Sequence, residues 1–310
     1  MADIQVVEGT VKVDDVTLHT KSWFPSGPPK AKLIVIHGFS DHVDRYYDFF
    51  PTLARRGVAV YGFDQRGWGR SVRRPADKGR TGPTATVLSD IAAFIRAKVF
   101  GGGDGDGDVP VFMLGHSMGG GEVLTFASTP EYDDITAKIR GFILEAPFLG
   151  FAPEFQPSWL TIASGRLAAH VVPNFHLFKP VPPEHLSRDT EVQKNIADDP
   201  LMHNTGTLEG LAAMIDRAEF LSAGKLKLRP HVKSVFLAHG TADMVTSFDR
   251  VKEWWERQKL EDGTFKAYEG WFHQLHAEPG KEVFYQDVGD WILVRSGGGE
   301  EMRRAPESKL

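Results

Sequence analysis

One five-residue segment constrains the fold of this chain more than any other. Residues 115–119 read Gly-His-Ser-Met-Gly, the pattern G-x-S-x-G, which marks a sharp turn between a β-strand and an α-helix. An apolar run at residues 111–114 precedes the pattern, and Gly120 and Gly121 follow it. Glycines suit such a place because the turn is strained and brings strand and helix close together. The segment predicts a turn that presents Ser117 as a nucleophile; the alternative is an ordinary glycine-rich turn.

The rest of the chain alternates between apolar and amphipathic segments. Continuous apolar runs predict strands buried on both faces, and apolar residues at helical spacing predict the helices between them. An antiparallel hairpin is expected first, around Asp14 and Asp15. The expected strands that follow are residues 33–36, 58–63, 111–114, 142–144, 235–238 and 265–268, and the expected helices are residues 46–56, 86–100, 251–259 and 283–294. This order predicts an α/β fold, with a mostly parallel central sheet and helices on both faces.

One long segment interrupts the alternation. Residues 148–232 are rich in aromatic residues and proline and separate two expected sheet strands. Because plain loops of that length are uncommon in compact domains, we expect a helical cap, or lid, over the ligand-binding edge of the sheet. The alternative is a helical extension of the core. The predicted organisation is a core of residues 1–147 and 233–296, a cap of residues 148–232, and a flexible tail of residues 297–310.

Aromatic side chains within this expected cap allow two interpretations. Phe151, Phe155 and Trp159 are predicted either to touch a lipid surface, from which substrate is collected, or to roof a tunnel for substrate.

The composition excludes several classes of function. The net charge is −5 with both signs interspersed, which argues against nucleic-acid binding, and the chain has no cysteine for disulfides, thiol catalysis or metal sites. The N-terminus does not have a signal-peptide profile, and no apolar run approaches the roughly 20 residues that span a bilayer. The glycine- and aspartate-rich residues 101–108 fail the EF-hand spacing, so we expect a solvated connection there. Neither a metal nor an organic cofactor is predicted.

A nucleophilic serine needs a base, and the base needs an acid to orient it. In a strand–turn–helix setting of this kind, the acid and then the histidine each follow a later sheet strand. Asp243 comes shortly after residues 235–238 and is the candidate acid, while Glu145, at the end of an earlier strand, is its rival. His273 follows the last expected strand and is the candidate base, with His276 as the alternative.

Two backbone N–H groups are expected to hold the oxyanion that forms during attack. One belongs to Met118, the residue after the candidate nucleophile, and the other to Phe39, in the loop after the first buried strand. The Phe39 side chain is expected to line a site for an apolar acyl chain; the alternative is plain core packing. His116 is expected to pack beneath the turn.

These segments together resemble the monoacylglycerol lipases of the α/β-hydrolase superfamily, particularly the fungal branch. The resemblance covers about residues 33–294. It implies an α/β-hydrolase fold and a serine esterase with a cap, a tunnel for one long acyl chain, a small polar end that accepts glycerol, and no cofactor. The matching segments are Ile-His-Gly-Phe at 36–39, Phe-Asp-Gln-Arg-Gly-Trp-Gly-Arg-Ser at 63–71, residues 115–121, Asp-Pro-Leu at 199–201, His-Gly-Thr-Ala-Asp at 239–243, and residues 268–273.

The resemblance also implies roles for individual residues. Ser117 corresponds to the nucleophile, His273 to the base and Asp243 to its orienting acid. Phe39 and Met118 correspond to the oxyanion donors.

Further residues are candidates for binding the substrate. Asp41, Arg45 and His276 occupy places that hold the glycerol group in the family, and Glu145 is a further candidate. The chain departs from many relatives at Ser40, where they have glycine, and its cap sequence is the least similar region.

The chain ends in Ser308-Lys309-Leu310, a tripeptide that the peroxisomal import receptor reads. We therefore predict a peroxisomal protein; otherwise the cytoplasm or the lipid-droplet surface is expected. Because peroxisomes process acyl-CoA and fatty acids, an acyl thioesterase, an acyltransferase or a hydrolase of a metabolite ester is the alternative to monoacylglycerol hydrolysis. A second alternative is a ligand-binding protein on the same scaffold without turnover.

Overall fold

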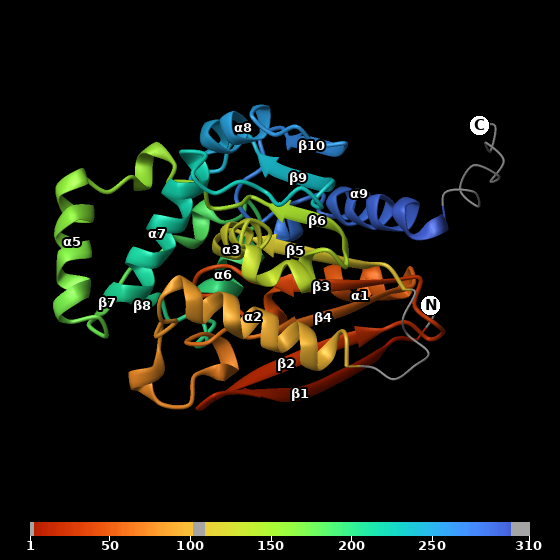
Figure 1. Cartoon of the computed structure of the whole chain (residues 1–310), viewed down its shortest axis with the longest axis horizontal. Helices are drawn as coiled ribbons and strands as arrows, with labels where there is room; N and C mark the ends of the chain where they lie inside the picture. The colour runs from red at the N-terminus through yellow and green to blue at the C-terminus, as the bar shows by residue number, and fades with distance from the viewer. Residues whose placement is uncertain (1–2, 102–108, 299–310) are drawn as a thin grey trace.

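The computed structural model describes residues 3–101 and 109–298 of the chain (Figure 1). Three predictions fall wholly or mostly on other residues. All but the first residue of the expected connection at 101–108, all but the first two residues of the expected tail at 297–310, and the targeting tripeptide Ser308-Lys309-Leu310 lie outside the described residues, and all three stay predictions.

An eight-stranded sheet forms the centre of the molecule, in the order β1-β2-β4-β3-β5-β6-β9-β10. β1 and β2 form the expected antiparallel hairpin, β2 is also antiparallel to β4, and the other neighbouring strands are parallel. The mostly parallel sheet of the prediction is therefore confirmed. Its strands are β1 (Gln5–Val13), β2 (Val16–Phe24), β3 (Ala31–Ile36), β4 (Val58–Phe63), β5 (Val111–His116), β6 (Ile139–Glu145), β9 (Ser234–Gly240) and β10 (Asp262–Tyr268).

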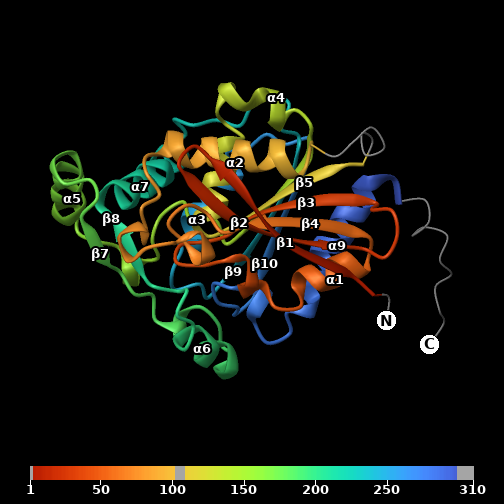
Figure 2. The ribbon, with the colours of Figure 1, turned by 90° about the horizontal axis from the view of Figure 1, so that it is seen from below.

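Helices cover both faces of this sheet. Because side chains alternate along a strand, Leu33 and Val35 of β3 pack with α1 and α9, whereas Ile34 and Ile36 pack with α2, α3 and α8. Figure 2 shows α1 and α9 on one side of the sheet and α2 and α3 on the other. The helices of this core are α1 (Phe49–Arg55), α2 (Thr84–Lys98), α3 (Met118–Phe126), α4 (Asp133–Thr136), α8 (Phe248–Glu256) and α9 (Glu282–Leu293).

One expected helix begins later than predicted. Residues 43–46 form a 3-10 turn, and α1 begins only at Phe49. Tyr47 between them has a φ of 46°, a left-handed conformation that a right-handed helix cannot contain. The start at residue 46 was therefore wrong.

The residues between β6 and β9 fold largely into helices, and we call residues 148–232 the insert. Within it, β7 and β8 pair antiparallel, α5 contacts α7, and α7 contacts α3. Figure 1 shows α5, α7, β7 and β8 gathered at one end of the sheet. The elements of the insert are a 3-10 turn (Pro153–Phe155), α5 (Trp159–Val171), β7 (His176–Phe178), a 3-10 turn (Pro183–His185), α6 (Thr190–Ala197), β8 (Thr205–Thr207) and α7 (Leu208–Ser222).

Within residues 3–101 and 109–298, no helix is both long enough and apolar enough to cross a membrane.

Candidate active site

Ser117 lies at the turn between β5 and α3, as the sequence predicted. Its backbone has a φ of 54° and a ψ of −119°, which is unfavourable for a residue with a side chain. The turn is also tightly packed, because a Cβ on Gly115 would lie 2.4 Å from the carbonyl oxygen of Gly119, and a Cβ on Gly119 would lie 2.2 Å from that of Ile36. The Ser117 N–H donates to the carbonyl oxygen of Glu145 at 2.9 Å. Neighbouring backbone therefore holds the strained serine in place.

The structure brings His273 and Asp243 together. They follow β10 and β9, which are adjacent parallel strands, so their loops lie at the same edge of the sheet. His273 Nδ1 lies 2.8 Å from Asp243 Oδ2. The Asp243 carboxylate also accepts the N–H groups of Val245 and Thr246, at 2.7 and 3.0 Å, and the Thr246 hydroxyl at 2.8 Å. These donors fix the carboxylate in one orientation.

Burial and hydrogen bonding act in opposite directions on Asp243. Burial raises the pKa of its carboxyl group, but the charge and hydrogen bond of His273 and the N–H of Thr246 outweigh that effect and hold the pKa below its usual value. Asp243 is therefore ionised at neutral pH. Because a carboxylate can only accept hydrogen bonds, the Nδ1 of His273 carries the proton, and its Nε2 is left to act as a base.

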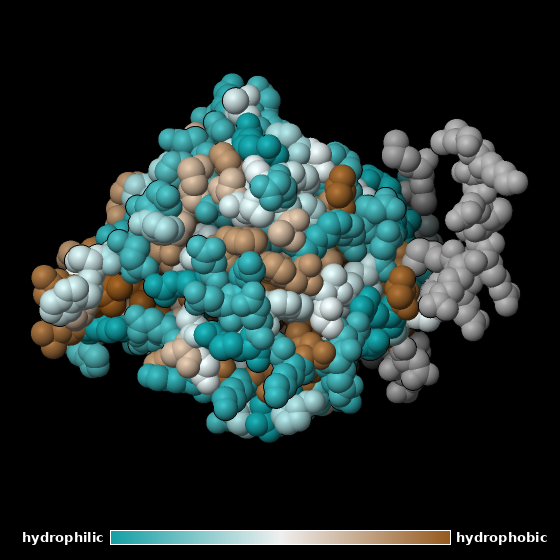
Figure 3. All heavy atoms as spheres, turned by 90° about the horizontal axis from the view of Figure 1, so that it is seen from above, coloured by the Kyte–Doolittle hydropathy of each residue, from teal (hydrophilic) through white to brown (hydrophobic). Residues whose placement is uncertain are grey.

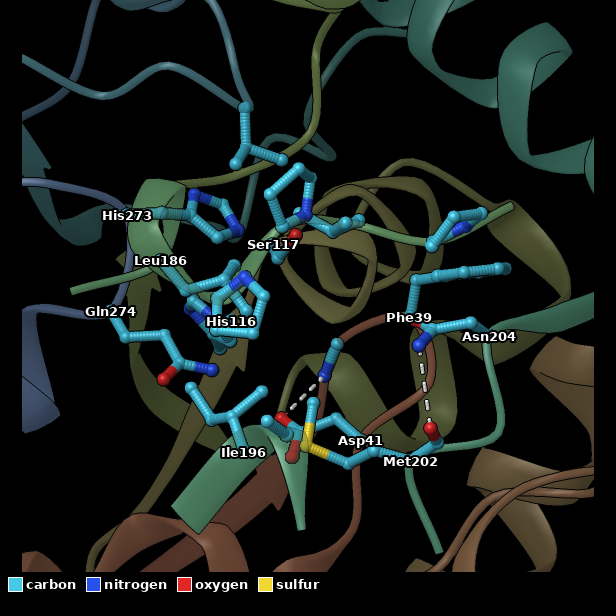
Figure 4. Close-up of a pocket in the computed structure, with 17 residues that line it drawn as sticks. Phe39, Asp41, His116, Ser117, Leu186, Ile196, Met202, Asn204, His273 and Gln274 are labelled. Atoms are coloured by element: carbon cyan, nitrogen blue, oxygen red, sulfur yellow. Dashed lines mark hydrogen bonds between the residues drawn. The ribbon is translucent and has the colours of Figure 1, made fainter. Parts of the chain in front are cut away.

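Two cavities meet at Ser117. The smaller cavity has a volume of about 300 Å³ and is also lined by Asp41 and His273, as Figure 4 shows. The larger cavity has a volume of about 460 Å³ and is predominantly apolar. Insert residues contribute to both, including Leu186, Ile196, Met202 and Asn204 in the smaller cavity and Phe151, Phe155, Leu177, Leu211 and Met214 in the larger.

The two expected oxyanion donors lie beside Ser117. Among the described residues, neither the Phe39 N–H nor the Met118 N–H is hydrogen-bonded to another group of the protein. The loop that contains Phe39 is in contact with the turn, because a Cβ on Gly38 would lie 3.2 Å from the Ser117 Cβ. The Phe39 ring lines both cavities and packs against Trp68, with ring centroids 4.8 Å apart. The ring therefore lines the cavities and packs in the core at the same time, and its contact with an acyl chain stays a prediction.

A serine nucleophile, an oriented histidine and two free N–H groups at a strand–helix turn are typical of one group of enzymes. The model of the serine aminopeptidase S33 family matches residues 27–280 of the chain. The chain belongs to this family. It is a serine ester hydrolase with an α/β-hydrolase fold, similar to the monoglyceride lipases.

Individual relatives agree with this assignment. The hydrolase is 34% identical to a Schizosaccharomyces pombe protein classed provisionally as a monoglyceride lipase, over 94% of this chain and 75% of the relative. It is 30% identical to the Mus musculus monoglyceride lipase, over 92% of this chain and 89% of the relative. A solved Saccharomyces cerevisiae monoglyceride lipase has the same fold, with a TM-score of 0.81 at 20% identity, covering 94% of this chain and 97% of that one.

Glu145 and His276 form a second pair away from the cavities of the hydrolase. His276 donates to Glu145 Oε1 from its main-chain N–H at 3.0 Å, and its Nδ1 lies 2.7 Å from the same oxygen. Both side chains are fully buried, and neither lines a cavity at Ser117. Glu145 therefore does not contact His273, as the rival acid would, and neither residue reaches the substrate space. The reason is the hydrogen bond from Ser117 to the Glu145 backbone, which places the end of β6 beneath the turn.

The remaining predicted substrate residues separate in the structure. Asp41 lines the smaller cavity and accepts the His42 N–H at 2.8 Å. Arg45 lines neither cavity at Ser117; its guanidinium contacts Asn195 in α6 and lies 3.4 Å from Asp199. Arg45 thus anchors the insert to the core. The expectation that it would hold the glycerol group did not include this role.

One cluster of the described residues has the composition of a metal site. Ligand atoms of His116, Glu145 and His276 all lie within 4.8 Å of one another. Tetrahedral ligands at the usual Zn–N distance of about 2.1 Å would lie about 3.4 Å apart, and Glu145 Oε1 is already hydrogen-bonded to His276. Burial lowers the pKa of His116 to about 3, so this histidine is neutral. A neutral imidazole could bind a metal, but the hydrogen bond between Glu145 and His276 occupies the space between these two ligands, and this pair fits a support for the turn better than a metal centre.

Sequence reasoning missed two residues of the site. Thr246 supports Asp243 from both its N–H and its hydroxyl, and Gln274 lines the smaller cavity beside His273. The signal for Gln274 was its position directly after the candidate base.

Proposed function

We propose that this serine ester hydrolase cleaves monoacylglycerols to a fatty acid and glycerol. The observation that carries the proposal is the meeting of two chemically different cavities at Ser117. The larger, apolar cavity suits a single long acyl chain, and the smaller cavity, with the Asp41 carboxylate in its wall, suits a small polar alcohol. The similarity to proteins named as monoglyceride lipases supports this choice.

The proposed reaction follows from the geometry. Ser117 Oγ attacks the ester carbonyl while His273 Nε2 takes its proton, and ionised Asp243 stabilises the resulting imidazolium. The N–H groups of Phe39 and Met118 bind the oxyanion, and each such donor typically contributes about 10²-fold or more to the rate. The C–O bond then breaks, and glycerol leaves with the proton from His273. Water repeats the sequence on the acyl-enzyme and releases the fatty acid.

A covalent probe tests the nucleophile. We expect a fluorophosphonate to label the wild type and Ser117→Ala to abolish labelling completely. Ser164→Ala is the matched control, because Ser164 is an exposed serine of α5, and it should label like the wild type. An unlabelled but folded wild type would favour the alternative of a binding protein without turnover.

A side-by-side assay tests the substrate. A monoacylglycerol, a p-nitrophenyl ester and an acyl-CoA with the same acyl chain are compared, and kcat/KM is expected to be highest for the monoacylglycerol. If the acyl-CoA is the best substrate, the thioesterase alternative replaces this proposal.

The location in the cell belongs to the same proposal. We propose that Ser308-Lys309-Leu310 directs the hydrolase to the peroxisome through the import receptor. A fluorescent protein followed by residues 297–310 should enter peroxisomes. The same fusion without the last three residues should stay in the cytoplasm. Equal distribution of the two fusions would contradict the proposal.

We also propose that α5 contacts a lipid surface. Several large apolar side chains of this part of the insert are exposed, and Figure 3 shows hydrophobic residues gathered at this end of the molecule. The two interpretations of the cap aromatics, contact with a lipid surface and roofing of a tunnel, suit different residues. Trp159 is 74% exposed, whereas Phe151 and Phe155 line the larger cavity. The exposed apolar residues of this region are Trp159, Leu160, Leu167, Val171, Val172, Phe175 and Phe178.

Vesicle sedimentation tests this contact. We expect Leu167→Asp with Val171→Asp to release the hydrolase from phosphatidylcholine vesicles, because each charge would enter the apolar layer. Val283→Asp is the matched control, since Val283 is 53% exposed on α9, outside the insert. Equal release by both variants would contradict a specific role for α5.

A further inference from the structure

The side chain next to the proposed base is buried, polar and without a hydrogen-bond partner. Gln274 is 3% exposed, and its Oε1 has no partner among the described residues. Its main-chain N–H donates to the carbonyl oxygen of Leu186 at 2.8 Å, so the position of the residue does not depend on its amide. Buried amides are normally hydrogen-bonded, because leaving one unpaired is unfavourable. In Figure 4 the Oε1 of Gln274 points away from Ser117 and its Nε2 points toward the cavity, so Nε2 is the atom with which a ligand can pair.

The position of Gln274 shows which part of a substrate would pair with its amide. Gln274 lines the smaller cavity together with Ser117 and His273, and it is absent from the lining of the larger one. In Figure 4 its amide lies near Ile196 of the insert, on the same side of the cavity as His273. His273 delivers a proton to the leaving alcohol, so the alcohol must lie on this side. The amide thus faces the leaving group rather than the acyl chain.

The insert gives this cavity a mainly apolar wall, with Asn204 as its polar exception. Val181, Leu186, Ile196 and Met202 of the insert are apolar. The Asp41 carboxylate accepts the His42 N–H at 2.8 Å and has the Gly38 N–H and the Tyr46 hydroxyl at 3.4 Å, so most of its acceptor capacity is occupied. The Nε2 of a carboxamide is a hydrogen-bond donor, which matches the oxygen of a hydroxyl as acceptor.

We infer that the Gln274 carboxamide binds a free hydroxyl of the leaving alcohol and so selects esters of polyols. The inference rests on the proposed monoacylglycerol function and names a residue that recognises the alcohol. An ester whose alcohol has no second hydroxyl leaves this amide unpaired, and such unpaired groups are what make a site discriminate between analogues. Gln274 is a specificity-determining residue, while bond cleavage belongs to Ser117 and His273.

The experiment compares two esters of the same fatty acid, the glyceryl ester and the propyl ester. Both alcohols have three carbons, and only glycerol has further hydroxyls. We expect the wild type to prefer the glyceryl ester, and Gln274→Met to lower its kcat/KM about tenfold, mainly through a higher KM, as for the loss of one hydrogen bond. The propyl ester should change by less than about threefold. Gln286→Met, at an exposed hydrogen-bonded glutamine of α9, is the matched control and should leave both esters unchanged.

The outcomes separate this inference from the proposed function. If the wild type cleaves both esters equally well, polyol recognition and the monoacylglycerol proposal are both overturned. If the wild type prefers the glyceryl ester and Gln274→Met keeps that preference, only the inference about Gln274 is overturned. Equal losses on both esters also overturn it, because they would show an effect on catalysis or folding. A second variant, Gln274→Leu, repeats the comparison. The rate of fluorophosphonate labelling measures its active serine directly.

Discussion

Two histidine–carboxylate pairs of nearly equal length lie close together in this hydrolase, and they differ in their access to Ser117. The His273–Asp243 contact is 2.8 Å and the His276–Glu145 contact is 2.7 Å. His273 lines the smaller cavity with Ser117, whereas His276 is fully buried and lines neither cavity at the serine. A short contact between histidine and carboxylate therefore does not by itself identify a catalytic pair. What distinguishes the two pairs in the structure is that His273 shares a cavity wall with Ser117 and His276 does not.

The surroundings of the two carboxylates differ as well. Asp243 has donors on both oxygens, while Glu145 Oε2, His276 Nε2 and His116 Nδ1 are buried and have no hydrogen-bond partner in the part of the chain that the structure describes. Burial raises the pKa of Glu145, but its interactions with His276 hold the pKa below the usual value. His276 also stacks on Tyr46, with ring centroids 4.3 Å apart. We interpret the Glu145–His276 pair as internal support for the turn that presents Ser117.

The largest expected difference between the pairs is in catalysis. We expect Asp243→Asn to lower kcat by a factor on the order of 10⁴, because the amide no longer holds His273 in the required tautomer. Glu145→Gln should lower kcat less than tenfold, since the Glu145 side chain is hydrogen-bonded to His276 and to neither Ser117 nor His273, and the substitution keeps its backbone contact with Ser117. Steady-state kinetics on one ester measure both variants. Losses of equal size would mean that the two pairs act as one catalytic unit.

The next largest effect concerns stability. Removing one partner of a buried hydrogen bond leaves the other unpaired and typically costs about 1–3 kcal/mol, more where a charged group is involved, so Glu145→Ala should lower the free energy of unfolding by about 3 kcal/mol in urea denaturation. His276→Ala added to Glu145→Ala should cost much less than His276→Ala alone, because the partners are coupled. Additive losses in this double-mutant cycle would show that the pair does not support the turn as a unit.

The smallest expected effect is on the pH dependence of stability. It distinguishes both pairs from a third buried carboxylate, Glu122. Glu122 of α3 lies 3.1 Å from buried Arg217 of α7, and burial raises the pKa of Glu122 from 4.5 to about 7 although Arg217 and Gln65 lower it. The folded state therefore holds this proton more tightly than the unfolded state does, and stability contributed by Glu122 falls as pH rises through that interval. Glu145 has the opposite sign, because its lowered pKa makes its contribution disappear below about pH 4.5.

Thermal unfolding at pH 5 and pH 8 measures the Glu122 effect. We expect the Tm of the wild type to decrease between pH 5 and pH 8. In Glu122→Gln this decrease should be smaller by about 3 °C, since the amide does not titrate. Glu145→Gln is the matched control and should keep the wild-type decrease. An unchanged decrease in Glu122→Gln would show that other groups cause it.

Much of this site could be predicted because its signals are local. Apolar runs predicted the strands that follow the hairpin, since strands buried on both faces need continuous apolar sequence, whereas alternation of polar and apolar residues predicted the hairpin of β1 and β2. The glycines around Ser117 predicted the turn, because neighbouring carbonyl oxygens leave no room for a Cβ at Gly115 or Gly119. The order of acid and histidine after later strands also predicted that Asp243 and His273 would meet, as they do at 2.8 Å.

Other parts depended on contacts between distant segments. Arg45 was expected beside the substrate, yet it contacts Asn195 in α6, 150 residues away in the chain. No local pattern indicates where the insert docks on the core, so neither this anchor nor the apolar wall that faces Gln274 was predictable.

The sequence alone determined the α/β fold, the serine at its turn and a short set of candidate partners, because periodicity, glycine spacing and strand order act over a few residues. Tertiary structure added that Asp243 pairs with His273 beside the cavity whereas Glu145 pairs with His276 away from it, and the catalytic roles of the first pair stay predictions. The physical reason is the placement of the strand ends around the turn. β9 and β10 bring Asp243 and His273 to the cavity, whereas the hydrogen bond from Ser117 to the backbone of Glu145 holds the end of β6 beneath it.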